Sequence, residues 1–130
     1  MAIEFPQELK YVDTHEYLRV EGDTVVIGVT SYAVEQLGDI VFVALPEAGE
    51  QFNRGDSFGS IESVKAVEEL YAPVSGTILA VNQAAVDDPS LIGVDPYGDG
   101  WLVIVRLGDT EELSETLSAE EYKERVGVET

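Results

Sequence analysis

The sequence predicts an all-β barrel or sandwich that carries a few helical turns. Two observations lead to this fold class. Hydrophobic residues alternate with polar ones or come in short runs, and glycine, proline, asparagine and aspartate interrupt these runs every few residues. A chain of 130 residues has the length of one domain, so we expect a single domain over residues 1–130.

The N-terminal part reads as a hairpin, a short helix and a strand. "KYVD" (10–13) and "YLRVE" (17–21) lead through Gly22-Asp23 into "TVVIGV" (24–29), which predicts strands joined by a tight turn. In "TSYAVEQLG" (30–38), Thr30 or Ser31 can cap a short helix that Gly38 ends. "DIVFVALP" (39–46) then reads as a buried strand.

The remainder reads as four strands, a loop region and a small helix. The strands are "DSFGSIES" (56–63), "VEELYAP" (67–73), "GTILAVN" (76–82) and "WLVIVRL" (101–107). Segment 81–100 should form a helical turn and an ordered loop. Residues 109–130 are expected to be an acidic tail packed on or beside the domain. Its helix is predicted by a capping box, Ser118 with Glu121, and by Gly127 at the end.

A short motif occurs twice in the strand-rich part of the chain. Pro46 and Gly49 form a Pro-x-x-Gly pattern that recurs at Pro73 and Gly76. If the two copies are a true repeat, they predict two similar strand-turn-strand halves packed face to face. Lys65 lies where the two copies join.

The composition excludes several classes of function. The chain contains no cysteine, which excludes disulfides, thiolate metal sites and a cysteine nucleophile. A net charge of −19 repels phosphate backbones and anionic lipids, so we expect no nucleic-acid or membrane partner. The same charge suits partners with basic docking faces. We expect a soluble, cytoplasmic monomer, because no apolar run is long enough to span a membrane and the N-terminus lacks a signal-like pattern.

The polar residues do not suggest a catalytic or metal site. His15 and Glu16 are neighbours in an extended run, where side chains point to opposite faces, so the single histidine is interpreted as structural. The serines have no second histidine with which to build a triad. Asp95 and Asp99 in "DPYGDG" lack calcium-loop spacing, so this motif is interpreted as a turn.

Lys65, one of only three lysines, is the principal candidate for a functional residue. It follows one strand-like run and precedes another, in "IESVKAVEELYAP" (61–73). Val64 and Val67 favour extended backbone on either side, and Ala66 leaves space beside the lysine. A lysine at such a hairpin tip is exposed and fixed at its root, which suits acylation of its amine. The alternative is an ordinary solvated charge.

The stretch around "ESVKA", with "QLGDIVFV" before it and "DPYGDGW" after it, resembles the H protein of the glycine cleavage system. The likeness runs from "THEYLRVEGD" to "GWLVIV", which is most of the chain. It implies a mainly β barrel-sandwich hybrid of the biotinyl/lipoyl-carrier type, with short peripheral helices and a C-terminal helix. In such a fold the modified lysine lies at a hairpin turn.

The resemblance also implies specific residues and partners. Lys65 would carry lipoic acid in amide linkage, and Glu62 and Gly76 would help lipoate-attaching enzymes to recognise the hairpin. Glu16 and Glu69 are candidates for the cleft that shelters the loaded arm. The arm would take the aminomethyl group of glycine from a pyridoxal-phosphate glycine decarboxylase to a tetrahydrofolate-dependent aminomethyltransferase. A flavin (FAD) dihydrolipoyl dehydrogenase would then reoxidise it, so the chain itself would be a carrier and not an enzyme.

Rival functions remain open on sequence alone. One is a lipoyl domain of a 2-oxo acid dehydrogenase, although such a domain usually belongs to a longer chain. Another is a biotin carrier, although those flank the lysine with methionine, and here its neighbours are Val64 and Ala66. An H-like protein that relays lipoyl groups to other enzymes, or a scaffold with unmodified Lys65, would also use this fold.

Overall fold

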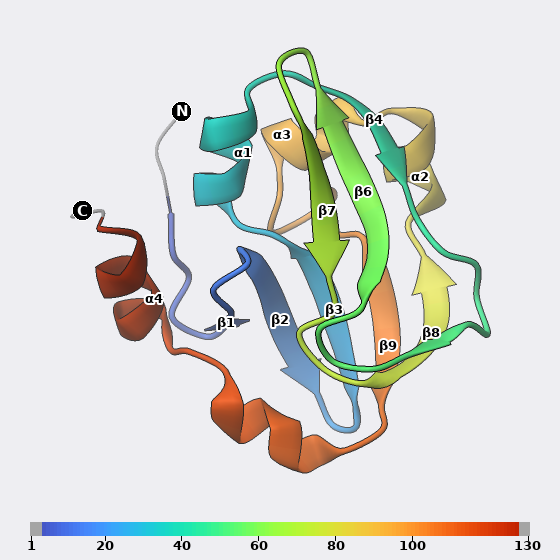
Figure 1. Cartoon of the computed structure of the whole chain (residues 1–130), viewed down its shortest axis with the longest axis vertical. Coiled ribbons are helices and arrows are strands. Elements are labelled where there is room, and N and C mark those ends of the chain that lie inside the picture. The colour runs from blue at the N-terminus through green and yellow to red at the C-terminus, as the bar shows by residue number, and fades with distance from the viewer. Residues whose placement is uncertain (1–3, 128–130) are drawn as a thin grey trace.

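The computed structural model describes residues 4–127, which form two antiparallel β-sheets packed face to face (Figure 1). The six-stranded sheet has the order β1-β2-β3-β9-β8-β5, and the three-stranded sheet has the order β4-β6-β7. Short helices surround the two sheets. The mainly β fold predicted from the sequence is therefore confirmed.

The six-stranded sheet gathers strands from both ends of the chain. The strands of the expected N-terminal hairpin pair in register around Gly22, whose φ of 66° suits the tight turn. The C-terminal strand then pairs with the second strand of that hairpin. In sheet order the strands are β1 (Lys10–Tyr11), β2 (Glu16–Glu21), β3 (Thr24–Val29), β9 (Val103–Leu107), β8 (Gly76–Val81) and β5 (Gln51–Phe52).

The three-stranded sheet contains the segments on either side of Lys65. Its strands are β4 (Ile40–Ala44), β6 (Ser57–Ser63) and β7 (Val67–Tyr71). β6 and β7 form a hairpin whose turn is the segment 64–66, at the top of Figure 1. β4 pairs with the other edge of β6.

The two Pro-x-x-Gly segments occupy equivalent places in the fold. Each leads from a strand of the three-stranded sheet, β4 or β7, to a strand of the six-stranded sheet, β5 or β8. β5 and β8 then pair with each other, and backbone hydrogen bonds join Gly49 and Glu50 to Ile78. The repeated motif therefore marks two matching crossovers between the sheets.

β4 is less buried than its sequence predicts. Val41 is 50% exposed and Phe42 is 53% exposed, although Ile40 and Val43 on either side are buried. The pairing of β4 with β6 shifts register between Ile40 and Phe42, and an irregularity of this kind re-aims the side chains of the strand. The expectation that this strand would be buried throughout was wrong.

The expected helices are present, together with two that were not predicted, because segment 81–100 contains two short helices where one helical turn was expected. α1 (Ser31–Leu37) is capped by the Thr30 side chain, and α4 (Ala119–Val126) has the predicted capping box and ends at Gly127 in the left-handed conformation. The loop region contains α2 (Gln83–Asp87) and α3 (Ser90–Val94). The additional 3₁₀ helix, η1 (Thr110–Glu115), precedes α4.

Two hydrophobic clusters hold these elements together. The main core fills the space between the sheets, with side chains such as Ile27, Ile61 and Val105 fully buried. A second, mainly aromatic cluster joins α4 to β1, β2 and the N-terminal segment. In this second cluster Tyr122 of α4 stacks on Tyr11 of β1 with 4.9 Å between ring centroids. The C-terminal tail is thus attached through tyrosines.

Two further expectations concern a metal site and a membrane-spanning segment, and the structure bears on both for residues 4–127. The Asp95 carboxylate accepts a hydrogen bond from the Asp99 backbone N–H at 3.0 Å, which closes the "DPYGDG" turn, and these residues contain no group of acids or histidine arranged to hold a metal ion. No helix in this range is long and apolar enough to cross a membrane.

Candidate functional site: a lysine at a hairpin turn beside a cleft

Lys65 lies in a turn that Ser63 organises. The Ser63 hydroxyl accepts hydrogen bonds from the backbone N–H groups of Lys65 and Ala66, at 3.3 and 3.1 Å. The Ser63 backbone N–H donates to the Ala66 carbonyl at 2.8 Å. A serine side chain bonded to the backbone two and three residues on is a common way to stabilise a tight turn. The root of Lys65 is therefore held while its side chain is exposed.

The turn is also attached to the rest of the molecule. The Val64 backbone N–H donates to the Asp39 carbonyl at 3.1 Å, which links the tip to the segment between α1 and β4. Gly38, which ends α1, lies so close to the lysine that an added Cβ would meet Lys65 Cε at 3.6 Å. The lysine stem thus runs past the C-terminal end of α1.

A cleft of about 350 Å³ opens beside the turn, starting at Ala66. One wall comes from α1, from the end of β3 and from the segment that leads into β2, and the other comes from the β6–β7 hairpin. Its volume is within the range of small-ligand sites. Residues from the first wall are Thr14, His15, Glu16, Val29, Tyr32, Ala33, Gln36 and Leu37, and those from the hairpin are Ile61, Ala66, Glu68, Glu69 and Leu70.

Glu16 is the most unusual residue of this cleft, because it is an acidic residue that is only 1% exposed. The carboxylate accepts hydrogen bonds from the Thr14 hydroxyl and, at 3.2 Å, from the Tyr71 backbone N–H. Burial raises the pKa of Glu16 to about 7, and these hydrogen bonds oppose the rise. Neither ion pair in the described part of the chain includes Glu16. A buried carboxylate without a cationic partner is characteristic of a functional site.

His15 lines the same cleft as Glu16, so the expectation that the two side chains point to opposite faces was wrong. His15 precedes β2 and has a φ of 77°, a left-handed conformation that is rare for residues other than glycine. In this conformation the His15 ring does not follow the alternating direction of the side chains along β2. Burial lowers the pKa of His15, although the nearby Asp13 and Glu68 partly oppose this.

Two exposed glutamates border the cleft from β7. Glu69, predicted from the resemblance, lines it and accepts a hydrogen bond from the Ser57 hydroxyl at 3.2 Å. Glu68, which pairs with the buried Ile61, also lines it. The sequence analysis did not select Glu68, and because β7 is an edge strand, a charged residue in it is no signal of a functional site.

Glu62 and Gly76, the two residues predicted to serve recognition, lie far apart. Glu62 is exposed on β6, opposite Val67. Gly76 begins β8, just after the segment that passes below the β6–β7 hairpin in Figure 1, whereas the turn with Lys65 is at the top. A Cβ at Gly76 would meet the Arg106 carbonyl oxygen at 2.3 Å, so close packing of β8 on β9 already requires this glycine.

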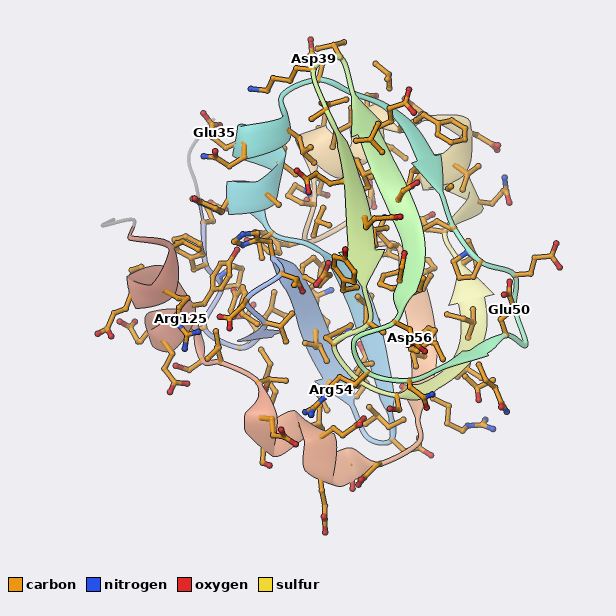
Figure 2. The ribbon with its side chains drawn as sticks, viewed as in Figure 1. Glu35, Asp39, Glu50, Arg54, Asp56 and Arg125 are labelled. Atoms are coloured by element: carbon orange, nitrogen blue, oxygen red, sulfur yellow. The ribbon has the colours of Figure 1, made fainter. Side chains whose placement is uncertain are left out.

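Charge is unevenly distributed around the lysine. In Figure 2, Asp39 lies beside the hairpin tip and Glu35 projects from α1 nearby, whereas Arg54 and Arg125 lie in the lower half of the molecule. Both of these arginines pair with carboxylates, those of Glu115 and Asp13. The surface around the hairpin tip therefore carries acidic side chains.

The fold and the site together define the class of protein. Two facing antiparallel sheets that present one lysine at a hairpin turn are the barrel-sandwich architecture of cofactor-carrier domains. A crystal structure of a glycine cleavage system H protein from Mycobacterium marinum superposes with a TM-score of 0.85 and 45% sequence identity. The match covers 95% of this chain and 99% of that one.

Sequence comparison identifies the family. The model of the family described as glycine cleavage H-protein matches residues 9–129. A glycine cleavage system H protein from Gloeobacter violaceus is 76% identical over 97% of this chain and 98% of its own length. One from a Synechococcus species is 65% identical over 94% and 95%. The chain belongs to the glycine cleavage H-protein family.

Proposed function

We propose that this chain is the lipoyl carrier of a glycine cleavage system and that Lys65 bears the lipoyl group in amide linkage. The observation that carries the proposal is the position of Lys65, exposed at a Ser63-organised turn and immediately beside a cleft that contains a buried carboxylate. Membership of the H-protein family supports the pathway.

The residues present fit a lipoyl arm loaded with an aminomethyl group. Such an arm is apolar along its length and cationic at its end. The cleft offers apolar surface from Leu37, Ile61 and Leu70, and Glu16 lines it. A protonated amine would supply the cationic partner that Glu16 otherwise lacks.

When bound, the lipoyl group supplies a disulfide that accepts the aminomethyl group with two electrons and is later reoxidised. The chain's own residues supply presentation and shelter. The turn presents the amine of Lys65 to solvent, where other enzymes can reach it. The cleft reduces the access of water, and the Glu16 carboxylate binds the ammonium group in this low-dielectric setting. Glu69, which is exposed, contributes less for the same reason.

The partners follow from this role. We expect the chain to dock in turn with a glycine decarboxylase, an aminomethyltransferase and a dihydrolipoyl dehydrogenase, and with the enzymes that attach lipoate. The acidic hairpin tip favours partners with a basic rim. We expect Glu62, exposed beside the turn, to contribute to recognition by the lipoate-attaching enzymes. Gly76 contributes through the packing of β8. The chain has no catalytic residues of its own in this scheme, and a cytoplasmic location stays a prediction.

Two measurements test the proposed function. The first is intact mass and peptide mapping of the protein from its native host, where a lipoyl adduct on Lys65 is expected. A biotinyl adduct or an unmodified lysine in lipoate-replete cells would contradict it. The second is glycine–bicarbonate exchange with a purified glycine decarboxylase. Lipoylated chain that supports no exchange would exclude glycine cleavage and favour a lipoyl-relay role.

A further inference from the structure

The C-terminal helix α4 contacts the wall of the cleft through the hydroxyl group of Tyr122. Tyr122 is fully buried, and its hydroxyl lies 2.7 Å from Nδ1 of His15 and 2.8 Å from Oγ1 of Thr30. His15 lines the cleft, and Thr30 caps α1, which forms part of the same wall. One residue that is distant in sequence thus contacts two supports of the cleft.

The direction of these hydrogen bonds follows from the donors and acceptors present. Oγ1 of Thr30 accepts from the Ala33 backbone N–H at 3.2 Å, and Thr30 is fully buried. The buried hydroxyl hydrogen of Thr30 needs an acceptor. Among residues 4–127, the acceptor within hydrogen-bond distance is the hydroxyl oxygen of Tyr122. Thr30 therefore donates to Tyr122, and Tyr122 donates its own hydrogen to Nδ1 of His15. The opposite direction would leave a buried hydroxyl hydrogen unpaired.

This direction determines which nitrogen of His15 carries the proton. Nδ1 accepts, so a neutral ring must be protonated at Nε2. Within the described range, Nε2 has no hydrogen-bond partner, and no buried side-chain nitrogen or oxygen is unsatisfied there. Nε2 is therefore accessible, on a ring that lines the cleft. Burial also lowers the pKa of His15, which favours the neutral ring.

We propose that Tyr122 is a positioning residue that holds His15 as the Nε2–H tautomer, so that the cleft offers one N–H donor beside the acceptor provided by Glu16. This proposal rests on the proposed function, because the donor would serve the uncharged acceptor atoms of the arm, its amide carbonyl or a sulfur. The ammonium group is left to Glu16, because an N–H group cannot accept its hydrogen bond. The C-terminal helix then acts in specificity as well as in packing.

The single histidine of the chain makes a direct test possible. Two-bond ¹H–¹⁵N correlation spectra of the unmodified full chain at neutral pH report the tautomer of His15 without overlap. We expect the Nε2–H form in the wild type, and a detectable population of the Nδ1–H form in Tyr122→Phe. A wild-type ring protonated at Nδ1, or a spectrum unchanged by Tyr122→Phe, would overturn the proposal.

Tyr11→Phe is the matched control. Tyr11 is fully buried in the same aromatic cluster, stacks on Tyr122 and donates its hydroxyl to the Pro6 carbonyl at 2.7 Å. This variant loses a comparable buried hydrogen bond but leaves His15 in place. A change of tautomer in Tyr11→Phe as large as in Tyr122→Phe would show that general loosening is responsible, and would also overturn the proposal.

The lipoylated chain provides the second readout. Because Tyr122→Phe removes the Nε2–H donor from part of the molecules, the loaded arm should hydrolyse faster in this variant, by up to about fivefold, which is the effect of losing one neutral hydrogen bond. In Tyr11→Phe it should hydrolyse at the wild-type rate. Equal rates in the wild type and Tyr122→Phe would overturn the use of the donor. If the wild-type arm hydrolysed as fast as free loaded lipoamide, the proposed shelter itself would fail. The tautomer of His15 is measured on the unmodified chain and does not depend on the arm. A failure of the positioning by Tyr122 can therefore be told apart from a failure of the proposed shelter.

Discussion

The hairpin turn and the cleft wall lie side by side, yet they are built in opposite ways. The turn is local, since its hydrogen bonds run between Ser63, Lys65 and Ala66, with one link outward to Asp39. The wall is not local, because Glu16 is held by Tyr71, 55 positions away, and His15 by Tyr122, 107 positions away. Presentation of an exposed amine needs a few neighbouring residues, whereas a sheltered polar site needs distant segments that exclude water together.

Replacing Lys65 should have the largest effect, because it removes the function of the turn and leaves the cleft wall unchanged. Lys65→Arg keeps the charge but removes the amine that can form the amide, so we expect no lipoyl adduct and glycine–bicarbonate exchange at background. The cleft should be unaffected, because the side chain is exposed and surface substitutions usually change the free energy of unfolding by less than about 0.5 kcal/mol. Exchange at the wild-type rate would disprove the attachment site.

Removing Glu16 should damage the wall and leave the turn intact. A charge-assisted hydrogen bond is worth about 1.5–3 kcal/mol, so in Glu16→Ala the loaded arm should hydrolyse roughly 10- to 100-fold faster. Lipoylation of Lys65 should proceed as before. Glu69→Gln is the matched control, and we expect less than about a twofold change there, because this carboxylate is exposed. An unchanged hydrolysis rate in purified Glu16→Ala would remove the role of Glu16.

The pH dependence of stability should report the burial of Glu16. Its pKa is raised from 4.5 to about 7 on folding, so between these values the folded state binds more protons than the unfolded state. Stability is therefore lost as the pH rises through this window, by on the order of 3 kcal/mol. Glu16→Gln lacks this titration, so its stability relative to the wild type should increase from pH 4.5 to pH 8. Urea unfolding of both proteins across this range is the measurement, and parallel curves would contradict it.

Disturbing the turn should have the smallest effect. Ser63→Ala removes the hydroxyl that accepts from Lys65 and Ala66, so we expect a loss of about 1 kcal/mol in the free energy of unfolding. Amide hydrogens of the turn should also exchange faster, while those of β2 and α4 should not. Faster exchange at His15 and Glu16 would show that the turn and the wall are coupled.

Much of the fold could be predicted from the sequence because its signals are local. Alternation and short apolar runs located β1–β4 and β6–β9 but not the two-residue β5, Gly22 located a turn, and the Ser118–Glu121 pair located the start of α4. Each signal depends on residues a few positions apart. Lys65 could be selected in the same way, from the strands on either side and from the resemblance to a family.

Two of the misses depended on tertiary contacts. The register shift in β4 exposes Val41 and Phe42, and it arises in the pairing with β6. The left-handed backbone of His15 occurs where its ring meets Tyr122, so neighbouring residues gave no sign of it. Ser63 is different, because a serine at a predicted turn is a local signal. The sequence analysis did not use this signal to predict that Ser63 organises the turn.

The sequence by itself therefore determined the class of fold, the strands and caps, the acidic surface and the exposed position of Lys65, because periodicity, turn chemistry and charge act over short distances. The tertiary structure decided the properties of the cleft. Burial raises the pKa of Glu16, and a tyrosine from the C-terminal helix bonds His15. Burial and buried hydrogen bonds exist only once distant segments have packed together and water has been excluded.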